Sequence, residues 1–424
     1  MTTVKQEKYF DKFETDKLLN DLYGENSPEL ELRLNNLIDT FKSNFGLTGE
    51  AMIFSSPGRI EICGNHTDHN HGKVMAAAVS VDILAVVMPT DDNVVSVDSD
   101  GYPRMTVDLK DISFKEENKG TSFALIQGVA DYFVAHGYKV GGFRGAFTSR
   151  VPKGAGVSSS SAFEVLVGEI FNVLYNDGKI SAMEKAKASQ YAENRYFGKP
   201  CGLMDQAAIA LGGVNLIDFK DTDNPIVEPA LWENDQLDIF VINAGGDHSD
   251  LVDDYAGILN DMKNVAKFFS VDCLRKTTKA DVLKFSNTLR EKLSGRAVLR
   301  ALHFFEECDR VDEALIALKN KDIGKFLDVI NRSGDSSWRL LQNLYPPCDV
   351  EQYLPFAITV CKESGLCEAV RVHGGGFAGT ILAFVKKENS EKFNAKMANN
   401  FGSDCVFKLT VRKDGAIKAA EVRL

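Results

Sequence analysis

The sequence predicts an α+β fold in two domains, and three observations support this prediction. The chain has 424 residues, which is enough for two domains. From Ala51 to about Val151, short β-branched runs dominate, and one helical stretch interrupts them. The later strands and helices follow no regular βαβ alternation, which favours α+β over a parallel α/β sheet. The turn-rich segment 215–232 is the best boundary, and it divides the chain into residues 1–222 and 223–424.

The sequence pattern predicts the following helices and strands along the chain. Residues 1–46 place Leu, Ile and Phe at helical spacing and predict two helices. A helix over FALIQGVADYFVAHG lies among the strands, and a strand ends near Arg150. An amphipathic helix, AFEVLVGEIFNVLYNDG, stops at Asp177–Gly178, and a second helix follows in SAMEKAKASQYAENRYFG. The second half predicts a strand in LDIFVINAG, several helices from Tyr255 to about Leu344, and closing strands in GGGFAGTILAFV and CVFKLTV.

Composition narrows the class of protein. The chain is 44% hydrophobic and 26% charged, as globular proteins are, and its net charge of −11 argues against a nucleic-acid partner. Its eight cysteines include no CxxC pair, so we expect reduced thiols. The charged N-terminus lacks the apolar run of a signal peptide. The most apolar stretch, 74–88, contains Ser80 and Asp82 and predicts a strand pair, or a strand and turn. We therefore expect a cytoplasmic protein with no membrane partner.

The stretch VPKGAGVSSSSA, residues 151–162, predicts a phosphate-binding loop. It joins a strand to a helix, and its glycines permit close backbone approach to a ligand. Free amide groups and the helix dipole make a helix start attractive to anions, and serine hydroxyls add further donors. A flexible linker is the alternative, but a linker rarely opens into a strongly amphipathic helix. The loop lacks the Lys-Ser/Thr pair of the P-loop motif GxxxxGK[ST].

Four blocks together give a specific resemblance. They are SSPGRIEICGNHTDHNHGKV, the Gly/Ser loop, AENRYFGKPCGLMDQAA and AVRVHGGGFAGTILAFV, with a weaker fifth match in HSDLVDDY. In this order they resemble the GHMP small-molecule kinases and, within them, the galactokinases, whose fingerprint is PGRxNLIGEHTDYNxG. The resemblance implies a two-domain fold with the active site in the cleft between domains. It also implies an ATP-dependent kinase that phosphorylates the anomeric hydroxyl of galactose.

The resemblance assigns the phosphoryl-transfer residues. Asp205 is the catalytic carboxylate beside the sugar C1 hydroxyl, and Arg59 stabilises the transferring charge. Ser160 and Glu193 are the Mg²⁺ ligands, because that cation prefers oxygen. Without the family match, Asp205 would be a helix cap or turn residue, Arg59 would belong to a surface ion pair, and Glu193 would be an exposed helix carboxylate. The ATP phosphates contact a loop composed of Gly154, Ala155, Gly156, Val157, Ser158, Ser159 and Ser160.

The sugar contacts are expected from three segments of the chain. His66 and Asp68, in NHTDHN, bind ring hydroxyls, and the family position opposite the 6-hydroxyl is Asn65. The Gly202 backbone and the Tyr255 phenol add further contacts. A zinc site at the three histidines of this stretch is the alternative, but their spacing is loose and no cysteine completes it.

Three departures from the family pattern limit the identification of the sugar and the adenine pocket. Asn65 replaces a Glu, which removes a charged acceptor and also a charge that would repel a C6 carboxylate. His69 replaces a Tyr, and Ser122 and Leu125 stand where an aromatic-Asn-Tyr pattern is expected near adenine. A kinase for a related sugar such as galacturonate is therefore the first alternative. A catalytically silent sugar-sensing regulator is the second, although the serine loop is full length.

Overall fold

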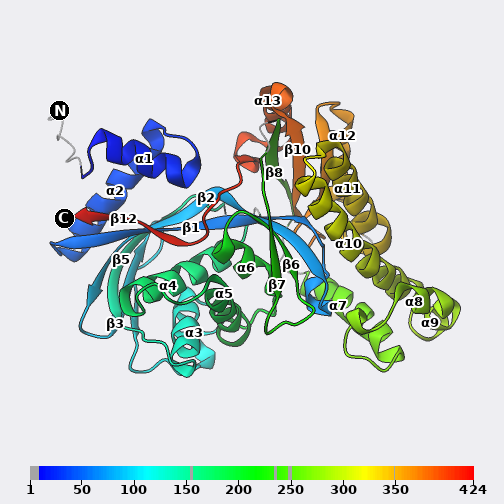
Figure 1. The fold of residues 1–424 in the computed structure, drawn as a ribbon, viewed down its shortest axis with the longest axis horizontal. Helices are drawn as coiled ribbons and strands as arrows, with labels where there is room; N and C mark the ends of the chain where they lie inside the picture. Colours follow the sequence, from blue (N-terminus) through cyan, green and yellow to red (C-terminus); the bar gives the residue numbers. More distant parts are fainter. Residues whose placement is uncertain (1–8, 153–155, 234–235, 247–250, 348) are drawn as a thin grey trace.

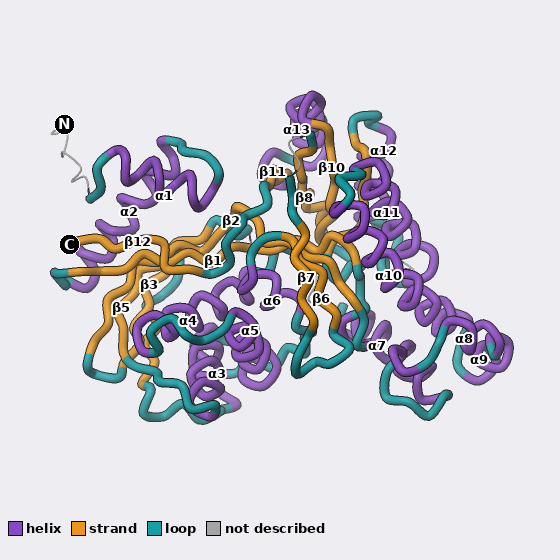
Figure 2. Tube along the Cα trace, in the orientation of Figure 1, coloured by secondary structure: helices purple, strands orange, loops and turns teal. Residues whose placement is uncertain are grey.

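The computed structural model describes residues 9–152, 156–233, 236–246, 251–347 and 349–424. Within these residues the chain forms two sheets with helices packed against them, as Figures 1 and 2 show. This arrangement confirms the predicted α+β class. None of the helices in the described ranges combines the length and apolarity needed to cross a bilayer.

The first sheet has eight strands and carries most of the candidate site. Its main path runs in the order β12-β1-β2-β5-β3-β4, and β6 and β7 extend it from β2. Apart from the parallel pair β3 and β5, neighbouring strands are antiparallel. The bounds are β1 Glu50–Cys63, β2 Lys73–Thr90, β3 Val94–Ser99, β4 Met105–Asp108, β5 Gly142–Ser149, β6 Val214–Asp218, β7 Ile226–Ala230 and β12 Ile417–Arg423.

The apolar stretch 74–88 forms one long strand, so the predicted strand pair or strand and turn is wrong. The polar residues that suggested an interruption sit at a β-bulge, where the register against β1 shifts between Pro57 and Gly58. Asp82 is fully buried there and accepts hydrogen bonds from Arg33 at 2.6 Å and from the Tyr23 hydroxyl at 3.0 Å. A carboxylate with these partners can continue a strand through the interior.

Helices cover both faces of the first sheet (Figure 1). On one face lie the two predicted N-terminal helices, α1 Lys12–Tyr23 and α2 Pro28–Phe45, which bury a leucine-rich stripe against β1, β2 and β12. On the other face lie α3 Ser122–Ala135, α4 Ser159–Tyr175, α5 Ala182–Tyr191 and α6 Met204–Leu211. The predicted amphipathic helix is present as α4, but it begins inside the Gly/Ser stretch at Ser159, before the predicted start at Ala162, and it ends at Tyr175, just before the predicted stop at Asp177–Gly178.

The second sheet has four antiparallel strands in the order β11-β8-β10-β9. They are β8 Leu237–Gly245, β9 Cys367–His373, β10 Gly379–Lys386 and β11 Val406–Leu409. Helices α11 Ile323–Ser336, α12 Tyr353–Glu363 and α13 Ser390–Phe401 pack on these strands. Farther from the sheet, α7 Val252–Phe268, α8 Lys279–Lys284 and α9 Ser286–Lys292 pack against the long helix α10 Gly295–Lys319. Two strands that follow residue 223, β7 and β12, lie in the first sheet, so the predicted boundary at 222/223 divides the chain without separating the sheets.

Candidate active site

The Gly/Ser loop lies between β5 and α4. Gly154 and Ala155 lie outside the described residues. Gly156 has φ +65°, and a Cβ at this position would collide with the Thr380 hydroxyl, so glycine is required here. Val157 is buried, and its carbonyl oxygen accepts a hydrogen bond from the Arg59 backbone N–H at 3.2 Å. The loop is therefore fixed against β1.

The serines of this loop start the helix. Ser158 precedes α4 with φ +61°, and its hydroxyl donates to the Asp205 carboxylate instead of capping the helix. Ser159 and Ser160 are the first residues of α4, where amide N–H groups have no intrahelical partner. The structure thus brings a helix start, a serine hydroxyl and a carboxylate together at one point.

Arg59 and Asp205 form a two-pronged ion pair. Arg59 Nε donates to Asp205 Oδ1 at 2.8 Å, and Nη2 donates to Oδ2 at 2.6 Å. Arg59 lies in β1 and Asp205 in the first turn of α6, and the remaining guanidinium nitrogen donates to the Gly156 carbonyl. Burial alone would raise the pKa of Asp205, but the Arg59 charge and the bonds from Arg59 and Ser158 lower the pKa below its usual value. Asp205 is therefore ionised at neutral pH.

Glu193 is a second carboxylate of the site, and only 2% of its side chain is exposed. It lies in a π-helical turn, η3 Ala192–Phe197, a feature often found at functional sites. The Ser160 hydroxyl donates to Oε1 at 3.1 Å, and Gln206 Nε2 donates to Oε2 at 2.7 Å. A hydroxyl and a carboxylate at this separation fit Mg²⁺, which takes hard oxygen ligands and completes its shell with water and phosphate. Within the described ranges, no three His, Cys, Asp or Glu side chains gather as a metal site.

The sugar loop, residues 65–70, is a short segment between β1 and β2 that contacts chain segments around both sheets. Asp68 lies so close to Gly202 that a Cβ on Gly202 would overlap its carboxylate. Tyr255, from α7, donates its hydroxyl hydrogen to the Gly376 carbonyl at 2.9 Å. Four predicted sugar residues, His66, Asp68, Gly202 and Tyr255, are thus found on this loop and on the two segments beside it.

The two imidazoles of this loop belong to one chain of hydrogen bonds, in which each group donates to the next. His66 Nε2 lies 2.9 Å from the Gly375 carbonyl, so it carries the proton, and His66 Nδ1 accepts from His69 Nε2 at 3.3 Å. His69 Nδ1 then accepts from Asn70 Nδ2 at 3.0 Å. Burial lowers the pKa of His66 to about 3, with a further contribution from His69, and lowers that of His69 to about 4. Both rings are therefore neutral near pH 7.

Asn65 begins the loop and is only 1% exposed. Its Nδ2 donates to Glu61 Oε1 at 2.9 Å and to the Gly374 carbonyl at 2.7 Å, and its Oδ1 accepts from Asn343 Nδ2 at 2.7 Å. All of its polar atoms thus have protein partners. The predicted contact with the sugar 6-hydroxyl remains a prediction, and it requires one of these bonds to be exchanged.

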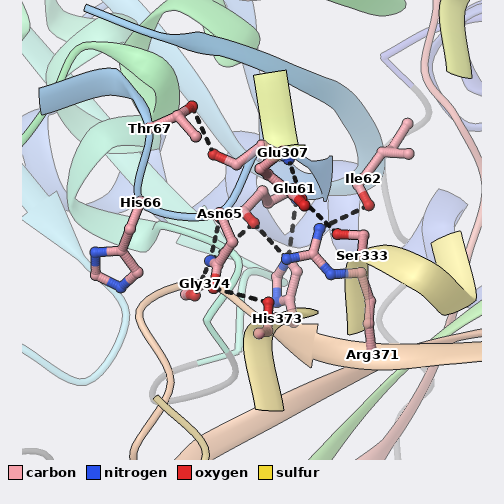
Figure 3. A network of polar contacts seen from close by, with 12 residues as sticks. Glu61, Ile62, Asn65, His66, Thr67, Glu307, Ser333, Arg371, His373 and Gly374 are labelled. Carbon is pink, nitrogen blue, oxygen red and sulfur yellow. Dashed lines mark hydrogen bonds and ion pairs between the residues drawn. The ribbon is translucent and has the colours of Figure 1, made fainter. Parts of the chain in front are cut away.

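Figure 3 shows the buried network to which Asn65 belongs. Arg371, in β9, is fully buried and donates to Glu61 Oε1 and to the Ile62 carbonyl, both at 2.8 Å. Glu307, in α10, accepts from the Gly64 backbone N–H at 2.9 Å, and His373 Nε2 accepts from the Glu61 N–H at 3.1 Å. These bonds join the first sheet to the second directly behind the sugar loop.

Comparison with known proteins gives the family of the chain. Residues 124–213 match the model for the GHMP kinases N terminal domain, and residues 39–89 match the galactokinase galactose-binding signature. A galactokinase from Actinobacillus pleuropneumoniae is 30% identical over 375 residues, which cover 87% of this chain and 94% of the relative. The chain belongs to the galactokinase family.

Other comparisons extend the likeness, one in sequence and two in fold. A galactokinase from Pyrococcus furiosus is 29% identical over 79% of this chain and 89% of its own length. The crystal structure of a Lactococcus lactis galactokinase complexed with galactose aligns with a TM-score of 0.79 at 23% identity, covering 91% of this chain and all of that one. The mevalonate kinase of Methanococcus jannaschii aligns with a TM-score of 0.60 at 16% identity, covering 87% and 99%.

Several residues that shape this galactokinase-family site were missed by sequence reasoning. Glu61 and Arg371 each stand alone in an apolar strand, in RIEIC and AVRVH. A lone charge inside a buried strand must have a partner, and this signal was available. Lys199, which lies 3.2 Å from Glu193, gave no such signal, because a lysine in a glycine-containing segment is typical of a solvated loop.

Proposed function

We propose that this protein is an ATP-dependent galactokinase, which transfers the γ-phosphoryl group of ATP to the anomeric hydroxyl of galactose. The observation that carries the proposal is the Arg59–Asp205 pair, at 2.6 and 2.8 Å, placed against the serine loop in a chain of the galactokinase family. Phosphoryl transfer depends mainly on positioning and charge stabilisation, and this constellation supplies both.

In this proposal Asp205 aligns the sugar hydroxyl and accepts its proton. The lowered pKa makes Asp205 a weak base. It therefore takes the proton late, after the bond to phosphorus has begun to form and the hydroxyl has become acidic. Arg59 keeps Asp205 ionised and presents positive charge to the transferring group. Ser158 fixes the second carboxylate oxygen and, with the start of α4, faces the phosphate oxygens.

Ser160 and Glu193 would hold the magnesium ion that accompanies ATP, and Mg²⁺ there would neutralise charge on the phosphates. Gln206 orients Glu193 by donating to Oε2, which leaves Oε1 toward Ser160. His66, Asp68, Gly202 and Tyr255 would contact the sugar. The ionised Asp205 and its intact arginine partner favour a working enzyme over a silent regulator.

The geometry weakens the galacturonate alternative. That alternative rested on the loss of a negative charge at Asn65. However, Glu61 lies 2.9 Å from the Asn65 amide and pairs with Arg371 at 2.8 Å, so the carboxylate missing at position 65 is present on the neighbouring side chain. Since the relatives of this chain include curated galactokinases, galactose remains the preferred substrate.

The test is ADP release with a panel of galactose, galacturonate, N-acetylgalactosamine, glucose and arabinose. Product identification by phosphorus NMR shows whether C1 carries the new phosphate. We expect galactose to give the highest kcat/KM and the 1-phosphate as product. Absence of ADP release with every sugar, or a preference for another sugar by about tenfold or more, would overturn the proposal.

A further inference from the structure

Lys199 is an exposed lysine that reaches a buried carboxylate. Its side chain is 63% exposed, whereas the side chain of its partner Glu193 is 2% exposed, and Lys199 Nζ lies 3.2 Å from Glu193 Oε1. The residue lies in the segment between η3 and α6, in the sequence GKPCG. The side chain thus folds inward at its tip while its stem stays in solvent.

The oxygen that Lys199 contacts is the one shared with Ser160. The Ser160 hydroxyl donates to Glu193 Oε1 at 3.1 Å, while Oε2 is held by Gln206 and by the Cys201 thiol. An ammonium group and a divalent cation repel each other at such separations. They therefore cannot both hold Oε1 at full strength.

Lys199 also lies in the field of the catalytic carboxylate. Desolvation opposes its charge, but Glu193 and Asp205 outweigh this effect and raise the pKa of Lys199. The ammonium group, 3.2 Å from Glu193 Oε1, is therefore attracted to both carboxylates. Its exposed four-carbon stem gives it the freedom to change partner.

We propose that Lys199 is a second cation of the phosphoryl-transfer site, which competes with the divalent metal for Glu193 Oε1 and contacts the phosphate oxygens once the metal has displaced it. This inference rests on the proposed function, in which Ser160 and Glu193 hold the metal. It adds a residue that carries positive charge to the transferring group, beside Arg59.

Metal binding without turnover gives the first test. Mn²⁺ replaces Mg²⁺ as the probe, and its free signal is followed by electron paramagnetic resonance in the absence of nucleotide and sugar. We expect Lys199→Met to bind Mn²⁺ on the order of tenfold more tightly than wild type, because one repelling charge is removed. The gain should vanish in Lys199→Met/Glu193→Gln. Unchanged Mn²⁺ affinity in Lys199→Met would overturn the competition.

Lys119→Met is the matched control. Lys119 packs its stem against Gly198, in the same segment, but its ammonium pairs with the exposed Glu116 at 3.0 Å. Its loss should leave Mn²⁺ affinity and turnover unchanged. Circular dichroism melting of both variants checks that the fold is retained.

Kinetics with MgATP test the second half of the proposal. Lys199→Met should reach half-maximal activity at a lower Mg²⁺ concentration, yet its kcat should fall by about 10- to 100-fold because a phosphate contact is lost. An unchanged kcat would show that Lys199 does not contact the phosphate oxygens during transfer. A different result would show that the metal site of the proposed function is wrong. If Glu193→Gln alone binds Mn²⁺ as tightly as wild type does, then Glu193 is not a metal ligand, and Lys199 cannot compete with a metal there.

Discussion

The two ends of the candidate site are built differently. At the phosphoryl-transfer end (Arg59, Ser158, Ser160, Glu193 and Asp205), every side-chain contact joins elements packed on the first sheet. The sugar loop (residues 65–70) is held across the molecule, with partners such as Asn343 and Gly375. The first end keeps the family pattern, and the second departs from it at Asn65 and His69. The groups proposed for phosphoryl transfer thus lie within one part of the fold, while the region proposed for the sugar depends on how the two sheets pack together.

The position of Glu61 sharpens this contrast. The family fingerprint places Asn two residues after the arginine and Glu six residues after it. This chain has Glu61 and Asn65 at those positions. Because the two side chains are hydrogen-bonded, the amide and the carboxylate have exchanged places within one pair. A departure that suggested a new substrate therefore has a simpler reason, which is a compensated exchange.

The largest effect is expected at the phosphoryl-transfer end. Asp205→Asn removes the charge that aligns the acceptor hydroxyl and takes its proton. We expect kcat to fall by about 10²- to 10⁴-fold, with ATP binding largely retained. Steady-state kinetics and nucleotide titration by calorimetry measure the two quantities. Near wild-type turnover in this variant would show that Asp205 is not the catalytic carboxylate, and the proposed difference between the two ends would be wrong.

The next effect is expected at the sugar loop and concerns stability. Asn65→Glu places a carboxylate against Glu61 in a fully buried network, and we expect a loss of about 3 kcal/mol in the free energy of unfolding. Adding Glu61→Asn removes the repulsion and should recover more than half of this loss. Urea unfolding of both variants gives the values. If the double variant is no more stable than the single one, the exchanged-pair explanation is wrong.

The paired imidazoles predict a pH dependence of stability. His69 has its pKa lowered to about 4 in the folded protein, against 6.5 unfolded, so the unfolded chain binds the proton first as pH falls. Folding stability is therefore lost below about pH 6.5, by about 2 kcal/mol per imidazole between pH 7 and pH 5. His69→Phe should reduce this pH-dependent loss by that amount in urea unfolding at the two pH values. An unchanged loss would show that the ring is not held neutral.

The smallest effects concern the metal. Glu193→Gln should raise the Mg²⁺ concentration for half-maximal activity by about tenfold, because a charged ligand is lost. Ser160→Ala removes a neutral ligand and should raise it by only about two- to threefold. Magnesium titration at saturating ATP and galactose checks the order. A larger effect in Ser160→Ala than in Glu193→Gln would show that Glu193 is not a metal ligand.

The sequence predicts the phosphoryl-transfer end of the site better than it predicts the network behind the sugar loop. The Gly/Ser loop, the start of α4 and the pairing of Arg59 with Asp205 could be expected, because they lie in contiguous blocks that resemble a family. The network around Arg371 could not be placed, since Glu61 and Glu307 are far apart in the chain and only the packing of β9 and α10 against β1 brings them together. The prediction for residues 74–88 was wrong for a related reason. Asp82 suggested a break in the strand, because its partner Arg33 is far away in the sequence and the sequence alone did not show their pairing.

The pairing of β1 with β12 has a consequence for biosynthesis. These are the first and last strands of the chain, and they lie side by side from Glu50 opposite Arg423 to Ser55 opposite Ile417. A ribosome releases β1, with Arg59 on it, long before β12 exists. The outer edge of β1 therefore stays unpaired through most of translation, and an open strand edge invites pairing with other nascent chains. The first sheet is therefore completed only when the final strand pairs with β1.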